Sequence, residues 1–176
     1  MSHLALDAEA LYAELVRGVG RLLDADAVIV GVWSGGAWLA QRLQRDLNRS
    51  GEAGVISSAL HRDDYGQRGM AQSDATRLPW SIDGRSIVIV DDVLHTGRTI
   101  RAVINELYDF GRPAKVSLAV LVDRNGRELP IEATYAAARV TLPADQRLRL
   151  ARQADGRFTF SVTTTTPATG NNGGAA

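Results

Sequence analysis

Cysteine is absent from this chain of 176 residues, and lysine occurs only once, as Lys115. The absence of cysteine excludes disulfides, thiolate nucleophiles and cysteine metal sites. The formal net charge is zero, so the chain lacks the overall positive field of a dedicated nucleic-acid binder. No apolar run approaches membrane-spanning length, and the first residues lack the charged-then-apolar pattern of a signal peptide. Together these absences predict a cytoplasmic protein whose chemistry does not use thiols.

Apolar residues alternate between helical and strand spacing, which predicts a single α/β domain over residues 1–162. The polar segment 61–83 is predicted to be a flexible loop, and the low-complexity segment 163–176 a disordered tail. One helix is expected to start after Asp7, a second to span 37–49 and a third to start near Ile100. Expected strands lie at 27–32, 55–60, 87–90 and 116–122, with short strands around Tyr135, Leu148 and Phe158 that complete the sheet edge.

The most informative segment, residues 86–101, joins a buried strand to a helix through a polar loop. The apolar run 87–90 ends in two carboxylates, Asp91 and Asp92, and the small polar residues 96–99 precede the helical pattern. Backbone N–H groups at a helix N-terminus hold phosphate, whereas acids just before it repel phosphate and suit ribose hydroxyls or a metal ion. The segment therefore predicts a sugar-phosphate site. The alternative is a buried strand and a capped helix in some other doubly wound protein.

This segment resembles the phosphoribosyl-diphosphate (PRPP) binding motif of the type I phosphoribosyltransferases. The resemblance implies that family's fold, a mainly parallel central sheet flanked by helices, with a small hood and a flexible loop. It also implies that Asp91 and Asp92 are catalytic residues that contact the ribose hydroxyls. The loop implied to hold the 5′-phosphate consists of Leu94, His95, Thr96, Gly97, Arg98 and Thr99.

A glycine-containing turn follows the first predicted strand. Glycine lets the backbone approach a ligand closely, although Ala37 stands where a Walker P-loop requires lysine. From the residues alone, a plain tight turn is an equal alternative. The resemblance implies a pyrophosphate-binding loop here, often with an unusual cis peptide, formed by Val32, Trp33, Ser34, Gly35 and Gly36.

Two further segments are expected to reach the substrate. From charge alone, Arg62 in the polar segment is expected to belong to a solvated loop with an incidental charge cluster, but the resemblance implies a flexible loop here whose arginine folds over pyrophosphate as a catalytic lid. Val122, Asp123 and Arg124 end the neighbouring strand at the same edge, where a flat base can be read by backbone groups and by stacking on Arg124. The alternative there is a simple polar turn.

The resemblance narrows to the PyrR family, bifunctional regulators of pyrimidine operons with uracil phosphoribosyltransferase activity. It rests on His-Arg-Asp-Asp at 61–64, the acid pair with its loop, Gly-Arg-Pro at 111–113 and the run from Leu121 to Ile131. It implies PRPP and uracil as substrates, UMP as product, and Mg²⁺ held mainly by PRPP and water rather than by side chains. It also implies a homodimer or a higher homo-oligomer. A phosphoribosyltransferase for a purine base is the alternative enzyme.

The regulatory activity of that family requires binding to messenger RNA, and here the sequence departs from the family pattern. Val16 and Gly20 stand at first-helix positions where other members carry polar residues, and Glu132 places an acid where a base would favour phosphate. An RNA-binding regulator of pyrimidine genes is therefore kept as the alternative function. Its candidate RNA contacts are Arg17, Arg21, Arg127 and Arg139.

Overall fold

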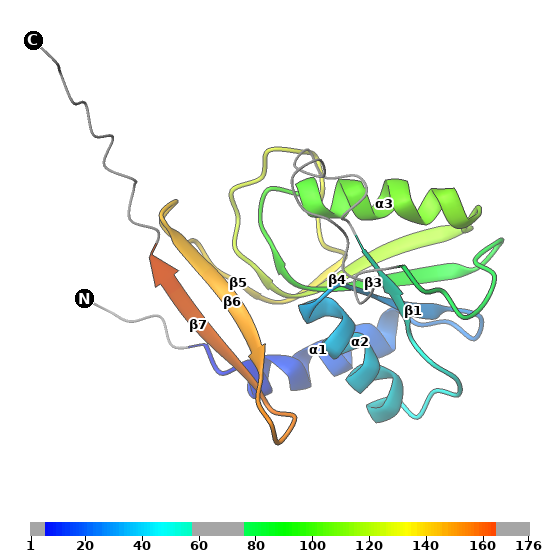
Figure 1. Ribbon diagram of the computed structural model, residues 1–176, viewed down its shortest axis with the longest axis horizontal. Coiled ribbons are helices and arrows are strands. Elements are labelled where there is room, and N and C mark those ends of the chain that lie inside the picture. Colours follow the sequence, from blue (N-terminus) through cyan, green and yellow to red (C-terminus); the bar gives the residue numbers. More distant parts are fainter. Residues whose placement is uncertain (1–5, 58–75, 165–176) are drawn as a thin grey trace, which may run out of the picture.

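The computed structural model describes residues 6–57 and 76–164 (Figure 1). It contains a five-stranded sheet of order β2-β1-β3-β4-β5 in which every neighbouring pair is parallel, and a separate antiparallel hairpin, β6-β7. The predicted α/β fold with a mainly parallel sheet is confirmed. In chain order the elements are α1 (Ala8–Leu22), β1 (Val28–Val32), α2 (Gly35–Asp46), β2 (Gly54–Ile56), β3 (Ser86–Leu94), α3 (Arg98–Phe110), β4 (Lys115–Asp123), β5 (Tyr135–Arg139), β6 (Gln146–Arg152) and β7 (Phe158–Thr164).

Helices cover both faces of the sheet, as Figure 1 shows, with α1 and α2 on one face and α3 on the other. Successive side chains of a strand point to opposite faces, so Val88 and Val90 of β3 pack toward α1 and α2 while Ile87 and Ile89 pack toward α3. A strand buried on both sides needs apolar residues at every position. This requirement explains the continuous apolar run that ends at the acid pair.

Helix α1 begins where the sequence predicts, at a cap formed by Asp7. The Asp7 carboxylate accepts hydrogen bonds from the backbone N–H groups of Glu9 (3.0 Å) and Ala10 (3.1 Å), which satisfies two donors that the first turn leaves without a helical partner. Leu15 and Val19 lie on the inner side of the helix and are fully buried. The cap and the apolar stripe together fix α1 on the sheet.

The hairpin β6-β7 forms the predicted hood beside the carboxyl ends of the sheet strands (Figure 1). The strands around Leu148 and Phe158 were predicted to complete the sheet edge, and this is wrong: they pair only with each other. The cause is local, because Leu150 and Phe158 bury their side chains against α1 and α2 rather than continuing the ladder beyond β5.

A salt bridge with a hydrogen bond attaches the hood to the helices. The Glu9 carboxylate accepts two hydrogen bonds from Arg42, both 2.8 Å, and one from the backbone N–H of Phe158 at 2.6 Å. The Arg42 guanidinium also lies over the rings of Tyr12 and Phe158, 4.1 and 5.1 Å from their centroids. Paired and hydrogen-bonded charge of this kind is stable when partly buried.

Two predicted boundaries differ from the structure. Thr163 and Thr164 belong to β7, where they pair with Arg147 and Gln146, so the predicted start of the tail at residue 163 is wrong. Residues 76–83 of the predicted flexible loop are packed on the protein, with Ile82 buried and Arg77 bridged to Val55. These residues were predicted as part of the polar segment, although several of them are apolar. The rest of the predicted loop and tail lies outside the described residues.

Among the helices at 8–22, 35–46 and 98–110, none combines the length and apolar character needed to span a membrane.

Candidate active site

The site lies where β1, β3 and β4 end at one edge of the sheet, because parallel strands place their carboxyl ends together. Strand β3 extends further than predicted, through the acid pair to Leu94. Asp91 pairs in register with Val120, and Leu94 with Asp123. Neighbouring positions of a strand face opposite sides, so Asp91 is buried in the fold and Asp92 is only half-buried at the edge. The predicted acid pair is thus held by strand geometry rather than by a loop.

The turn from β1 to α2 packs directly on the acid pair. A β-carbon added at Gly35 would lie 2.5 Å from Asp92 Oδ2, and one added at Gly36 would collide with the backbone carbonyl of Val90. Glycine is therefore required at both positions for the turn to reach β3. The peptide bond between Trp33 and Ser34 is cis, as the family resemblance implies for this position. The predicted pyrophosphate loop and the predicted ribose acids are therefore adjacent.

The predicted phosphate loop leads into the N-terminus of α3. Gly97 adopts a left-handed conformation, with φ of 89°, and Thr96 Oγ1 accepts a hydrogen bond from the backbone N–H of Arg98 (3.2 Å). Helix α3 starts at Arg98, so its first amide groups face this loop. The Arg98 side chain turns aside and donates from Nε to Glu128 at 2.6 Å. Backbone amides and the threonine hydroxyls remain the natural donors to an anion here.

Arg127 connects the ends of β3 and β4. Its guanidinium donates to Asp123 Oδ2 (2.6 Å), to the carbonyl of His95 (2.6 Å) and, through Nε, to the carbonyl of Ile131 (2.7 Å). Burial raises the pKa of Asp123, but the hydrogen bonds from Arg127 and from the backbone of Asn125 outweigh it and leave that pKa below its ordinary value. Arg127 therefore positions the phosphate loop and the predicted base-binding segment relative to each other.

Arg124 is 6 % exposed and lies beneath the hood. It donates to the backbone carbonyls of Gln146 (2.8 Å) and Pro143 (3.4 Å), so it joins the end of β4 to the hood. Its Nε atom is buried and has no hydrogen-bond partner within residues 6–57 and 76–164. An unsatisfied buried donor is costly unless a ligand or water supplies an acceptor. This atom is therefore a candidate hydrogen-bond donor to a ligand or water at this end of β4.

His95 is held against Gly126, whose added β-carbon would lie 2.8 Å from His95 Nε2. Burial lowers the pKa of His95, and the nearby Arg124 charge lowers it further. The imidazole is therefore neutral at neutral pH and does not add a positive charge to the phosphate loop. This supports a role in packing or hydrogen bonding rather than as a cationic anchor.

A cavity of about 630 Å³ lies between the β1-α2 turn and the hood. Its lining includes Ser34 and Asp92, two predicted site residues, together with Arg147 and Arg149 of β6. Neither arginine was predicted from the sequence as a site residue. The available signal was the alternation Arg-Leu-Arg-Leu at 147–150, which is typical of a strand with one polar and one apolar face.

The remaining predicted residues are not all brought to this site. Arg62 lies outside the described residues. Arg17 and Arg21 are exposed on α1 near Tyr135, the first residue of β5, while Arg139 ends that strand on the side of the site. The four candidate RNA contacts therefore do not form one patch, since Arg127 is occupied inside the fold. In the part of the chain that the structure describes, no group of three acidic or histidine side chains is arranged to hold a metal ion.

Comparison with known proteins agrees with this geometry. The phosphoribosyl transferase domain family matches residues 4–140. A "Bifunctional protein PyrR" of Ralstonia nicotianae is 49% identical over 169 residues, which cover 92% of this chain and 97% of that protein. One from Pseudomonas aeruginosa is 42% identical over 151 residues, covering 85% of each chain.

Solved structures confirm the fold. A hypoxanthine-guanine phosphoribosyltransferase of Bacillus anthracis superposes with a TM-score of 0.61 at 18% identity, covering 80% of this chain and 84% of that one. The hypoxanthine phosphoribosyltransferase of Trypanosoma cruzi gives a TM-score of 0.55 at 19% identity, covering 80% and 82%. The fold is thus shared with purine enzymes, whereas the sequence is much closer to the bifunctional proteins. By its sequence, the chain belongs to the PyrR family of phosphoribosyltransferase-domain proteins.

Proposed function

We propose that this protein transfers the phosphoribosyl group of PRPP to uracil, producing UMP and pyrophosphate. The observation that carries the proposal is the contact between the β1-α2 turn and the acid pair, with Gly35 directly against Asp92. A turn with close backbone approach, two carboxylates and a helix N-terminus at one sheet edge match the pyrophosphate, ribose and 5′-phosphate parts of PRPP. Uracil as the base is supported by the relationship to the PyrR proteins.

In this proposal each group acts by position and charge. The backbone of the 32–36 turn binds pyrophosphate, Asp91 and Asp92 hold the ribose hydroxyls, and the 94–99 loop holds the 5′-phosphate. Positive charge develops on the sugar as its bond to pyrophosphate breaks, and the nearby carboxylates stabilise that charge. Correct placement of uracil beside the sugar supplies much of the rest of the rate enhancement.

Magnesium fits this site as an ion that would bind together with PRPP. Mg²⁺ would be held mainly by PRPP oxygens and water, as the resemblance implies, and the nearby acid pair supplies negative charge that favours a divalent cation here. When bound, Mg²⁺ would neutralise charge on the departing pyrophosphate.

For the base, we propose that the end of β4 reads uracil through the backbone of Val122 and Asp123 and through Arg124. The buried Arg124 Nε supports this, because a ligand acceptor would satisfy it. Arg62 is proposed as a lid residue on grounds of sequence alone. Cytoplasmic location and a homo-oligomeric state likewise remain predictions from the sequence.

The test is conversion of labelled uracil to UMP with PRPP and Mg²⁺. The double variant Asp91→Asn with Asp92→Asn should lower kcat/KM by at least about a hundredfold, since it removes the charges that stabilise the transition state. Asp26→Asn, an exposed acid in the α1-β1 connection, is the matched control and should keep wild-type activity. A panel with hypoxanthine and guanine completes the experiment. Turnover of a purine without turnover of uracil would overturn the assignment of the base.

A second function, UMP-dependent binding of a pyrimidine-gene leader RNA, is proposed from the bifunctional relatives and from the exposed pair Arg17 and Arg21. Phosphate contacts make such binding weaken steeply with salt. Retention of the leader transcript should rise with UMP and fall with added salt. An RNA that shows neither response speaks against the regulatory function and leaves the enzyme proposal intact.

A further inference from the structure

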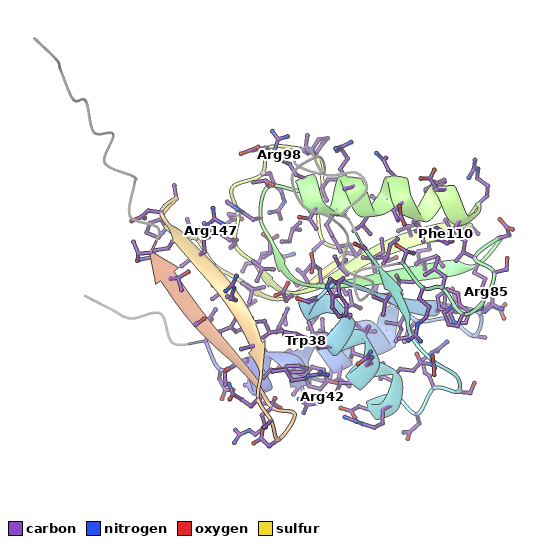
Figure 2. The ribbon with its side chains drawn as sticks, in the orientation of Figure 1. Trp38, Arg42, Arg85, Arg98, Phe110 and Arg147 are labelled. Atoms are coloured by element: carbon purple, nitrogen blue, oxygen red, sulfur yellow. The ribbon has the colours of Figure 1, made fainter. Side chains whose placement is uncertain are left out.

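Two arginines of the hood strand face the same cavity as the β1-α2 turn. Arg147 and Arg149 line it together with Ser34 and Asp92, and Figure 2 shows Arg147 on the side of the hood that faces the loops after β3 and β4. The two arginines are two residues apart in a strand, so they project from one face with a spacing of roughly 7 Å. Both arginines are exposed, while Leu148 and Leu150 of the other face also reach the cavity lining, and Leu150 is buried in the core, which fixes the strand.

The cavity carries more positive than negative charge. Its charged lining consists of two guanidinium groups and one carboxylate, that of Asp92. Within the described ranges neither Arg147 nor Arg149 makes a hydrogen bond or an ion pair with another side chain. The pKa of Arg124 is lowered first by burial and then by the Arg147 charge, so these two like charges repel each other. A ligand with several negative charges would balance them.

We propose that Arg147 and Arg149 bind the pyrophosphate group of PRPP, so that the hood supplies cations opposite the backbone of the β1-α2 turn. The inference rests on the proposed function, which places pyrophosphate at that turn. Pyrophosphate is favoured over the 5′-phosphate because Ser34 of the turn lines the cavity, whereas no residue of the 94–99 loop does. Arginine suits this role because its planar fork can contact two phosphate oxygens at once.

The experiment is titration calorimetry of the full chain with pyrophosphate and Mg²⁺, and separately with UMP. The double variant Arg147→Gln with Arg149→Gln should weaken pyrophosphate binding about tenfold or more, the loss expected for charge-assisted hydrogen bonds. UMP has no pyrophosphate, so its affinity should stay within about twofold of wild type. Replacement of both residues by lysine should restore part of the pyrophosphate affinity.

Arg157→Gln is the matched control, because it removes one charge from the turn of the same hairpin outside the cavity lining. It should bind both ligands like wild type. Unchanged pyrophosphate binding in the double variant overturns the proposal, as does an equal loss of UMP binding, which would indicate the 5′-phosphate or a general disturbance of the hood. If the wild-type protein binds pyrophosphate but does not convert uracil, the proposed reaction is refuted. The calorimetric comparison would still show whether Arg147 and Arg149 bind pyrophosphate.

Discussion

At the scale of single residues, the glycines of the β1-α2 turn each face a different neighbour. An added β-carbon meets the Asp92 side chain at Gly35 but meets the Val90 backbone at Gly36. Gly20, on α1, has only Leu47 near it, at an ordinary contact distance of 3.5 Å. A side chain can turn away and backbone cannot, so one chemical change has three different consequences at these positions.

Gly35→Ala should displace Asp92 and lower kcat/KM for PRPP about a hundredfold, because small displacements of a reacting group are costly. The free energy of unfolding should change little.

Gly36→Ala should instead destabilise the fold, since β3 must move. Gly20→Ala should stabilise the protein by about 0.5–1 kcal/mol through helix propensity. Urea unfolding and initial-rate kinetics measure both quantities. A Gly35→Ala enzyme with normal kinetics would contradict the close approach of turn and acid.

Arg127 makes contacts that lysine cannot reproduce, because three acceptors in different directions require the guanidinium fork. Arg127→Lys should lower the free energy of unfolding by about 2 kcal/mol and weaken UMP binding, since the phosphate loop loses its connection to β4. Arg101→Lys, an exposed position on α3, is the control and should leave both nearly unchanged. If UMP affinity survives Arg127→Lys, the positioning role is wrong.

At the scale of elements, strands and helices with a clear local sequence pattern were predictable. The pairing of strands that depends on distant parts of the chain was not. The strand before the acid pair could be recognised because both faces need apolar residues, and α1 could be recognised by its cap and stripe. The pairing of β6 with β7 could not, because it depends on where Leu150 and Phe158 find helices to pack on. The site followed the same rule: the local motif at 91–99 was predictable, whereas the arginines of the hood were brought in by tertiary structure.

The hood should become less firmly attached in acid. The hydrogen bond from Arg42 lowers the pKa of Glu9, with burial opposing and the Phe158 N–H assisting. The stabilisation is therefore fully present above the ordinary glutamate value of 4.5 and is lost as the pH falls through the lower folded-state value.

Hydrogen-exchange protection factors of residues 146–164 should fall in that acid range. Glu9→Gln should lower these protection factors already at neutral pH, with a loss of about 1 kcal/mol, and should make them less dependent on pH. The control is Glu52→Gln, which removes an exposed carboxylate whose ion pair with Arg77 spans 3.7 Å. Hood protection factors that do not change with pH in the wild type would show that Glu9 does not hold the hairpin.

At the scale of the whole molecule, the net charge is zero but the arginines are distributed unevenly. At the carboxyl edge, Arg147 and Arg149 line one cavity and Arg124 lies buried close to Arg147, whereas Arg17 and Arg21 lie along α1. The first group serves the proposed substrate and the second the proposed RNA contact. The two proposed activities can therefore be separated by mutation.

The double variant Arg17→Gln with Arg21→Gln should weaken retention of the leader RNA and reduce the slope of log affinity against log salt by about 1.4, or about 0.7 for each lost phosphate contact with a single strand. Uracil turnover should be unchanged. Filter binding over a salt series, with uracil turnover measured on the same preparations, provides both readings. An unchanged slope would show that these two arginines of α1 do not contact the RNA phosphates.

The joint between Arg124 and the hood has an evolutionary consequence. Its acceptors are main-chain carbonyls, at positions 143 and 146, so the bond does not depend on which side chain position 146 carries. The side chains of the hood can therefore differ among relatives, and so suit different ligands, while the same arginine still binds the hood backbone. Substitutions should accumulate freely at 146 and be purged at 124.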